Sequence, residues 1–260
     1  MNIIVCIKQV PDTTEIKLNP ETGTMIRDGV PSIMNPDDKA GLEMALQLKD
    51  KYNAHVTVIT MGPAQSEKIL REAYAMGADR AIQLTDRKFA GADTLATSNA
   101  LAGALRTLDF DLIIAGRQAI DGDTAQVGPQ IAEHLDLPQV TYVEDLQYKE
   151  PKTFTIKKST EEGYQIVEVD APCLITVLSS ANDPRYMSVG GIVTAFKKDI
   201  EAWGFDNISV DEQKLGLKGS PTRVFKSFTK GARMAGQMYE VGAAQAVDII
   251  IEKLKEKFVI

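Results

Sequence analysis

Cysteine and histidine are scarce in this sequence, which has two of each among its 260 residues. Structural zinc sites and iron–sulfur clusters usually need four ligands drawn from these residue types, so we expect neither kind of centre. Cys6 and Cys173 lie far apart, each in an apolar run. This placement predicts two reduced thiols in the core of a cytoplasmic protein.

Basic residues are not in excess either, because the formal net charge is −7. A nucleic-acid partner is therefore not expected, since phosphate backbones require clustered Lys and Arg. No apolar run approaches the roughly 18–20 residues that span a bilayer, and the run at residues 3–7 lacks the basic segment of a signal peptide. We expect no membrane insertion.

Common catalytic motifs are also missing, among them G-x-G-x-x-G, G-x-x-x-x-G-K-[ST], G-x-S-x-G, C-x-x-C and H-E-x-x-H. The apolar content of 44% and the charged content of 25% are those of an ordinary globular protein. The length allows one large domain, or one domain with an appendage.

Apolar runs rich in β-branched residues alternate with segments of helical periodicity. We predict strands at residues 3–7, 55–60, 81–84, 112–115 and 173–178. Helix starts are indicated by Asn35 before Pro36, by Asp93, and by Gln126 with Pro129 in the first turn. The order of strands and helices favours an α/β fold with a doubly wound, mostly parallel sheet covered by helices on both faces.

Other parts of the chain follow different patterns. Residues 8–34 are predicted to be a long loop, either functional or folded into a small hairpin. Residues 153–157 and 165–169 alternate apolar and polar side chains, which predicts an antiparallel hairpin. Periodicity weakens after residue 179 until a helix near residues 240–257, so we expect a C-terminal arm ordered against another chain. We divide the chain into residues 1–185 and 186–260.

Three strand-to-helix corners, at residues 61–63, 91–97 and 116–127, form the candidate ligand site. In a doubly wound sheet such corners lie along one edge and can meet around one ligand. The helix that begins near Gln126 offers free N–H groups and a positive dipole end to a phosphate. Thr124 and Gln126 are therefore expected to contact phosphate, and Gly128 to let the backbone approach it.

Some polar residues near these corners have two interpretations. Asp121 and Asp123 are either turn formers or contacts to a ribose hydroxyl, a cation or the N–H groups of their own loop. Asn35 is expected mainly to cap its helix, although a capping residue can also contact a nucleotide. Met61 is either part of the core or a contact to adenine.

Several motifs in the same order resemble the beta subunit of electron-transfer flavoproteins. They are VCIKQVPD, MNPDD, MGPAQ, AMGAD, RQAIDGDTAQVG and IKKSTEEGYQIVEVDAPCLIT, the last at residues 156–176. The resemblance covers nearly the whole chain. It implies an αβα fold similar to adenine-nucleotide hydrolases, without hydrolytic activity, and an alpha-subunit partner that contains FAD.

The family has two classes, which differ in the ligand of the beta subunit. In one the beta subunit holds AMP, and the protein accepts electrons from acyl-CoA dehydrogenases. In the other it holds FAD, which NADH reduces, and the electrons are bifurcated to a CoA-ester dehydrogenase and to ferredoxin. Two stretches resemble the bifurcating class: AGADTLATS at residues 90–98 and SPTRVFKSFTK at residues 220–230. The pattern of that class has a glycine at position 90, so Ala90 departs from it.

The resemblance also implies roles for individual residues. It places adenine and ribose near Cys6, Asn35, Asp38 and Met61, and the pyrophosphate near Thr94, Thr97, Asp123, Thr124, Gln126, Val127 and Gly128. Five further residues at the same corners are expected to take part in cofactor binding: Gly62, Asp93, Gly116, Arg117 and Asp121. Residues 182–198 resemble the loop that binds the acyl-CoA dehydrogenase, with Tyr186 and Val189 as contacts. Val189 is smaller than the leucine expected there.

Two alternatives remain open on the sequence. The chain is either the bifurcating subunit or the AMP-holding electron carrier within this family. From another class, it could be a nucleotide-binding sensor or an enzyme similar to ATP pyrophosphatases, which would bind ATP without flavin.

Overall fold

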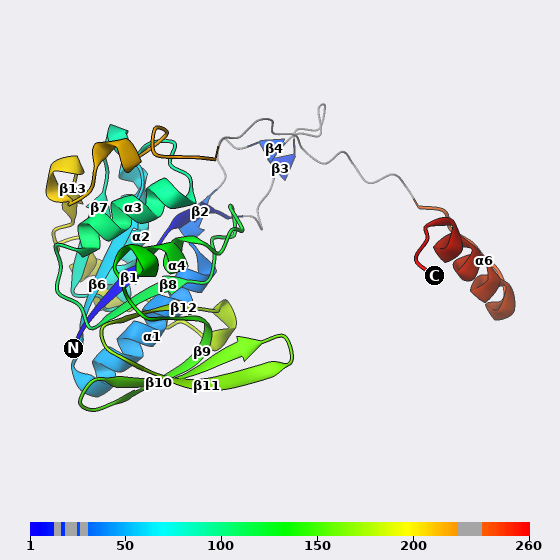
Figure 1. Cartoon of the computed structure of the whole chain (residues 1–260), viewed down its shortest axis with the longest axis horizontal. Helices are drawn as coiled ribbons and strands as arrows, with labels where there is room; N and C mark the ends of the chain where they lie inside the picture. The colour runs from blue at the N-terminus through cyan, green and yellow to red at the C-terminus, as the bar shows by residue number, and fades with distance from the viewer. Residues whose placement is uncertain (13–16, 19–24, 27–30, 223–235) are drawn as a thin grey trace.

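A nine-stranded sheet is the centre of the computed structural model, which describes residues 1–12, 17–18, 25–26, 31–222 and 236–260 (Figure 1). The strand order is β11-β10-β9-β12-β8-β1-β6-β7-β13. The strands are β1 (Asn2–Cys6), β6 (His55–Met61), β7 (Arg80–Leu84), β8 (Leu112–Gly116), β9 (Gln139–Lys149), β10 (Thr153–Thr160), β11 (Gly163–Asp170), β12 (Cys173–Val177) and β13 (Glu201–Trp203).

Parallel pairing runs through the sheet from β9 to β13. The register places Ile3 of β1 beside Val56 of β6 on one side and beside Leu112 of β8 on the other. Strand β12 pairs in parallel with both β8 and β9. Only β10 and β11, at one edge, pair antiparallel. The strands expected at residues 3–7, 55–60, 81–84, 112–115 and 173–178 are thus confirmed as parallel neighbours.

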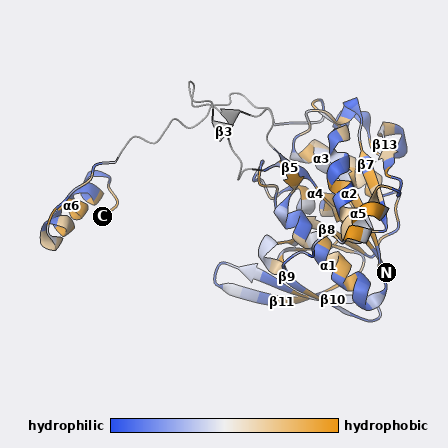
Figure 2. Ribbon diagram, turned by 180° about the vertical axis from the view of Figure 1, so that it is seen from behind, coloured by the Kyte–Doolittle hydropathy of each residue, from blue (hydrophilic) through white to orange (hydrophobic). Residues whose placement is uncertain are grey.

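Helices cover both faces of this sheet. Helices α1 (Pro36–Tyr52) and α2 (Glu67–Met76) pack on one face, and α3 (Thr94–Leu105) and α4 (Val127–His134) on the other. Alternate residues of β1 face the two apolar cores: Ile3 and Val5 contact the first, Ile4 and Cys6 the second. In Figure 2 the helices in front of the sheet carry hydrophilic and hydrophobic colours side by side, as expected for helices that bury one face. The doubly wound α/β class is therefore confirmed.

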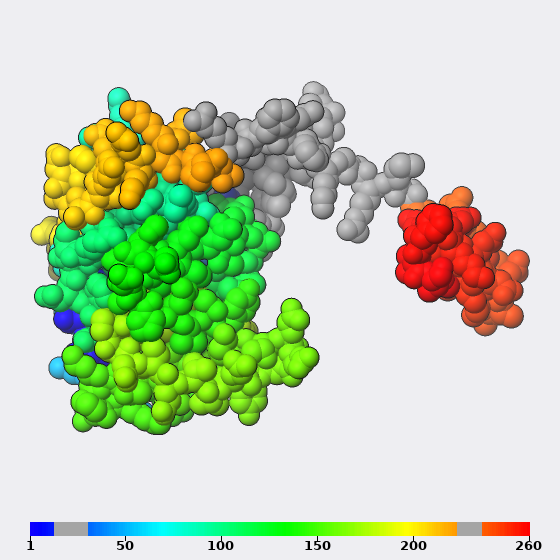
Figure 3. Space-filling model, in the orientation of Figure 1, coloured from blue at the N-terminus to red at the C-terminus, as the bar shows by residue number. Residues whose placement is uncertain are grey.

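The predicted antiparallel hairpin is confirmed as β10 and β11. It pairs from Thr153 with Asp170 to Thr160 with Gly163, so its strands are longer than the sequence pattern indicated. The end of the hairpin projects beyond the body of the molecule (Figures 1 and 3). Strand β11 is the edge of the sheet, which explains why Tyr164 and Ile166 are exposed.

The region after residue 179 has more structure than the sequence predicted. It contains α5 (Val189–Ala195), which packs on α2, and β13, which pairs in parallel with β7. Residues 201–203 therefore extend the chain's own sheet instead of belonging to an arm. A strand of three residues is too short to show the two-residue periodicity on which the prediction depended.

The remaining elements lie near the undescribed residues. Strands β2 (Gln9–Pro11) and β5 (Ser32–Met34) pair antiparallel, as do β3 (Lys17–Leu18) and β4 (Met25–Ile26), within the predicted loop of residues 8–34. The rest of that loop, and the part of the motif at residues 220–230 that follows residue 222, lie outside the described residues.

The C-terminal helix α6 (Ala243–Glu256) confirms the helix expected near residues 240–257. None of its residues is buried, and Val247, Ile250 and Ile251 are exposed on it. Among the helices of the described residues, none is long and apolar enough to cross a membrane.

Candidate functional site

A cavity of about 740 Å³ lies beyond the carboxyl ends of the central strands. Its lining follows the ends of β1, β6, β7 and β8. Strand order reverses at β1, because β6 and β7 lie on one side of it and β8 on the other. Such switch points are where doubly wound sheets bind ligands, and the volume falls within the range of about 300–1,000 Å³ of cofactor sites.

The three predicted corners all meet at this cavity. Of the residues predicted to bind a cofactor, those that line it are Cys6, Asp38, Met61, Gly62, Asp93, Thr94, Thr97, Gly116, Arg117, Thr124, Gln126, Val127 and Gly128. Asn35, Asp121 and Asp123 do not line it. Apolar side chains from the sheet and from α3, including Ile59, Leu84 and Leu101, form the rest of the wall.

Two helices begin at the cavity. The Asp93 carboxylate caps α3 by accepting the N–H of Ala96 at 3.0 Å, and Gln126 occupies the position before α4. The hydroxyl of Thr94 donates to Oε1 of Gln126 at 2.8 Å, which connects the two helix starts. Free N–H groups and positive dipole ends of both helices therefore face one cavity, an arrangement that suits an anion.

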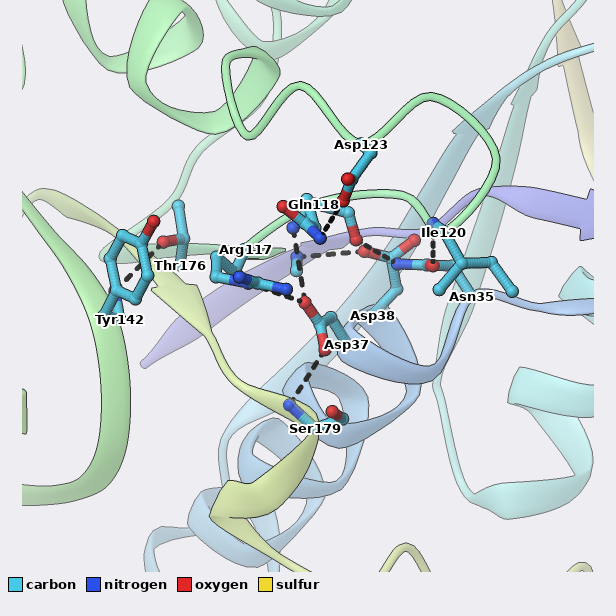
Figure 4. Close-up of polar contacts among 11 residues, drawn as sticks. Asn35, Asp37, Asp38, Arg117, Gln118, Ile120, Asp123, Tyr142, Thr176 and Ser179 are labelled. Atoms are coloured by element: carbon cyan, nitrogen blue, oxygen red, sulfur yellow. Dashed lines mark hydrogen bonds and ion pairs between the residues drawn. The ribbon is translucent and has the colours of Figure 1, made fainter. Parts of the chain in front are cut away.

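Asp37 and Asp38, in the first turn of α1, fasten the ends of three strands (Figure 4). Asp38 accepts the N–H of Lys8, which follows β1, at 2.8 Å and that of Gly116, at the end of β8, at 3.0 Å. Asp37 accepts the N–H of Ser179, just after β12, at 2.9 Å. Burial nevertheless raises the pKa of Asp38 to about 7, since desolvation outweighs these hydrogen bonds.

Residue 116 must be glycine because these hydrogen bonds bring the end of β8 very close to the start of α1. A Cβ there would collide with Oδ1 of Asp38 and come within 2.8 Å of Cβ of Asp37. Gly62 has a similar constraint, since a Cβ there would collide with Oγ of Ser66. Gly116 thus allows the end of β8 to lie against the start of α1, and Gly62 allows the end of β6 to lie against Ser66, just before α2.

Asn35 has a different role from the one predicted. It precedes α1, but its side chain makes no capping hydrogen bond and is fully buried. Its amide instead donates to the carbonyl of Gln118 at 2.8 Å and accepts the N–H of Ile120 at 3.1 Å (Figure 4). Helix capping was therefore the wrong expectation, because the side chain of Asn35 is occupied by hydrogen bonds to the loop of residues 117–126.

Asp121 and Asp123 shape that loop. Asp121 forms an ion pair with Lys8 at 2.7 Å. Asp123 has a left-handed backbone (φ 51°) and accepts a hydrogen bond from the Gln118 side chain. Ala125, two residues later, is also left-handed (φ 52°). These contacts favour the turn-forming interpretation, because Asp tolerates left-handed backbone better than most residues do.

Arg117 brings positive charge to the cavity wall. Its guanidinium lies 5.7 Å from the ring centroid of Tyr142, and its Nε lies 3.4 Å from Oδ2 of Asp37. Figure 4 shows it between these two side chains. Tyr142 itself has a left-handed backbone (φ 59°), rare for a bulky residue. Arg117 is thus restrained on both sides.

Gly128 is needed for a reason other than phosphate approach. A Cβ there would come within 2.6 Å of Cγ2 of Thr176, and next nearest would be the side chains of Ala115 and Leu174. It would therefore point toward the sheet rather than toward a ligand. The close packing of α4 on β8 and β12 explains this glycine.

The two cysteines are confirmed as free, buried thiols. Burial raises the pKa of Cys6 to about 12, with a smaller contribution from the negative charge of Asp38. Burial likewise raises the pKa of Cys173 to about 12. Both are therefore neutral at physiological pH, although Cys6 lines the cavity. Within the described ranges, no group of three or more His, Cys, Asp or Glu side chains could hold a metal ion.

Sequence reasoning missed several residues of the cavity wall, including Lys8, Arg87, Phe89 and Gln118. Each follows a parallel strand within a few residues: Lys8 after β1, Arg87 and Phe89 after β7, and Gln118 after β8. Applying the rule of strand carboxyl ends to every strand, and not only to glycine-containing corners, would have found them.

The predicted partner-binding residues lie outside the cavity: Tyr186 is on the loop before α5, and Val189 is the first residue of α5. Tyr186 is 98% exposed and Val189 is 82% exposed, although both are apolar in most of their surface. Arg185, beside them, is anchored by Glu43 at 2.8 Å and by Asp50 at 2.8 Å. The loop therefore presents apolar side chains to solvent from a fixed base.

Fold and cavity together define a doubly wound α/β protein with a ligand cavity at the switch point of its sheet. Residues 22–207 match the family described as "Electron transfer flavoprotein domain". The chain belongs to the electron transfer flavoprotein family, and its relatives include proteins named as beta subunits.

Three relatives illustrate this similarity. The electron transfer flavoprotein subunit beta of Clostridium acetobutylicum is 56% identical over 257 residues, covering 99% of both chains. The caffeyl-CoA reductase-Etf complex subunit CarD of Acetobacterium woodii is 51% identical over 263 residues, covering 100% of both. The acryloyl-CoA reductase electron transfer subunit gamma of Anaerotignum propionicum is 44% identical over 269 residues, again covering 100% of both.

Proposed function

We propose that this chain is the beta subunit of a bifurcating electron-transfer flavoprotein. In this proposal it holds FAD in the cavity and receives electrons from NADH. Together with an alpha subunit it passes them to a CoA-ester dehydrogenase and to ferredoxin. The observation on which the proposal depends is the single cavity at which both α3 and α4 begin, since two helix starts suit the two phosphates of a dinucleotide.

The residues around the cavity fit this ligand. The backbone N–H groups at the starts of α3 and α4 would hold the diphosphate, and Arg117 would offset its charge. The Thr97 hydroxyl lines the cavity and has no hydrogen-bond partner within the described part of the chain, so it is free to donate to a phosphate. Gly62 and Gly116 keep the strand ends close to the cavity without side chains of their own.

Buried apolar side chains would keep water away from the ligand. Ile59, Leu84 and Phe89 line the cavity and are each at most 5% exposed. When bound, FAD would supply the isoalloxazine ring that exchanges electrons, while the protein supplies position and electrostatics. No acid–base pair of side chains is needed for such a role.

An interaction with a CoA-ester reductase is supported by two relatives and one surface. The names of the Acetobacterium and Anaerotignum relatives place those proteins with caffeyl-CoA and acryloyl-CoA reductases. In this chain Tyr186, Val189 and Phe196 form an exposed apolar group around α5, with Phe196 73% exposed. Exposed apolar groups of this kind are typical of protein-binding surfaces.

A second partner is suggested by α6. Its apolar residues Val247, Ile250 and Ile251 recur at helical spacing, yet they are 53%, 57% and 39% exposed. An amphipathic helix gains most of its stability from packing its apolar face. The alpha subunit would supply the surface that covers it.

The test is to co-express the chain with its alpha subunit, release the cofactors and quantify them by absorbance and mass spectrometry. We expect FAD in both subunits and bleaching of flavin absorbance on addition of NADH. One FAD with one AMP per heterodimer, and no bleaching, would instead identify the AMP-holding carrier. Binding of ATP alone, without flavin, would contradict membership in either functional class.

A further inference from the structure

Residues 212–222, which we call the strap, lie against the wall of the cavity formed by residues 87–93. Leu215 of the strap is 2% exposed and belongs to the same apolar core as Phe89 of the wall. In Figure 3 the orange atoms of the strap lie directly beside blue-green atoms of the region that contains α3. The strap therefore supports the cavity wall from behind.

Close backbone contacts join the strap to the wall. The N–H of Leu217 donates to the carbonyl of Ala90 at 3.1 Å. Gly216 has a left-handed backbone (φ 52°), and a Cβ there would collide with the carbonyl of Lys88. Gly91 of the wall is also left-handed (φ 74°), and a Cβ there would lie 3.4 Å from Cβ of Leu217.

The strongest connection involves Ser220, which is 5% exposed. Its hydroxyl accepts the N–H of Asp93 at 2.8 Å and donates to the carbonyl of Gly216 at 2.7 Å. The N–H of Thr222 then donates to Oδ2 of Asp93 at 3.0 Å. The end of the strap is thus hydrogen-bonded to both the backbone and the side chain of Asp93.

Both carboxylate oxygens of Asp93 are consequently engaged within the chain. Oδ1 accepts the N–H of Ala96 and caps α3, while Oδ2 accepts the N–H of Thr222. Although burial raises it, the pKa of Asp93 is lowered on balance by these N–H donors, so the side chain is an anion. A carboxylate would repel a diphosphate, so direct contact is an unfavourable role for it.

We propose that Asp93 is a positioning residue that couples occupancy of the cavity to docking of the strap. The proposal rests on the proposed function, because it requires a nucleotide in the cavity. Asp93 joins the helix start that would hold the phosphates to the segment that precedes the C-terminal region. Coupling is reciprocal: if the docked strap favours nucleotide binding, bound nucleotide favours the docked strap by the same factor.

The decisive variant is Asp93→Ser. Serine caps helices well, so α3 should remain, but its single hydroxyl oxygen cannot also reach the N–H of Thr222. The matched control is Asp211→Ser, just before the strap, where the carboxylate accepts the N–H of Gln213 and contacts no residue of the wall. Ser220→Ala removes the other hydrogen bond between the strap and this residue, the one donated by the backbone N–H of Asp93, and decides the question if Asp93→Ser does not fold.

The complex with the alpha subunit would be stripped of nucleotide, and binding of FAD and of AMP would be measured by calorimetry. Hydrogen exchange of residues 212–222 would be followed with and without each ligand. In the unaltered protein we expect nucleotide to slow exchange in the strap. In Asp93→Ser we expect affinity to fall about tenfold, as for one hydrogen bond to a charged group, and in Ser220→Ala about fivefold, as for one hydrogen bond between neutral groups. In both variants we expect the protection to disappear.

Asp211→Ser should keep both the affinity and the protection. Nucleotide binding without any protection of the strap in the unaltered protein would overturn the coupling while leaving the proposed function intact. Unchanged affinity and protection in Asp93→Ser and Ser220→Ala would overturn it equally. If the unaltered complex binds neither FAD nor AMP, both the coupling and the proposed function are wrong.

Discussion

Asp38 allows a quantitative test of the electrostatics at the base of the cavity. Burial raises its pKa from 3.8 to about 7 in the folded chain. Between these values the folded state holds a proton that the unfolded state has released, so stability falls as pH rises. The folded and unfolded pKa values of Asp38 differ by about 3, and each pKa unit corresponds to about 1.36 kcal/mol. The free energy of unfolding should therefore fall by about 4 kcal/mol between about pH 4 and pH 7.

The assay is urea denaturation of the nucleotide-free full chain from pH 5 to pH 8, compared with Asp38→Asn. The variant has its own cost, but that cost does not depend on the titration of this group. We therefore expect the unaltered chain to lose about 1.4 kcal/mol per pH unit relative to the variant up to about pH 7, and little beyond.

Asp121→Asn is the control for this experiment, because it removes an equal charge from an exposed ion pair at the rim. Its stability should run parallel to that of the unaltered chain across the whole range. A constant difference between Asp38→Asn and the unaltered chain from pH 5 to pH 8 would refute the reasoning. It would mean that the hydrogen bonds to Asp38 lower its pKa at least as much as burial raises it.

Three further predictions concern binding and packing. Thr97→Val keeps the shape of the side chain but removes its hydroxyl, so nucleotide affinity measured by calorimetry should fall by about 1 kcal/mol; an unchanged affinity would exclude a phosphate contact there. Gly128→Ala should lower the free energy of unfolding by about 1–3 kcal/mol through its clash with Thr176, and the added change Thr176→Ser should restore much of it; a second change without effect would show that the clash is not the cause. Val189→Leu adds one buried methylene at the partner-binding loop and should tighten binding of the CoA-ester dehydrogenase by about 0.8 kcal/mol, about fourfold in Kd, whereas weaker binding in surface plasmon resonance would place Val189 outside the interface.

Much of the fold could be predicted from the sequence because its signals are local. Apolar runs mark the buried strands, and Asp93 marks a helix start that the structure confirms. Strand β13 escaped prediction because three residues do not establish a period. The strap was not predicted either, because it shows no local pattern: its hydrogen bonds reach a residue more than 120 positions earlier in the chain.

The candidate site was predictable where it follows a topological rule, and less so where it depends on individual partners. The carboxyl ends of parallel strands must meet at one edge, so the three corners could be placed together. The role of Asn35 depends on the fold of residues 117–126, which no local pattern specifies. Residue 128 must be glycine because of Thr176, which lies in β12, a strand that comes later in the sequence.

The pair Asp37 and Asp38 has a consequence for the order of folding. Its hydrogen bonds reach residues 30, 78 and 142 positions away. Closing loops of such length costs entropy before any contact compensates for it, so contacts of this range tend to form late. We therefore expect a chain released from synthesis before β12 to have its early strands and helices but an unfinished cavity floor, and to gain the capacity to retain a ligand only in the last stage of folding.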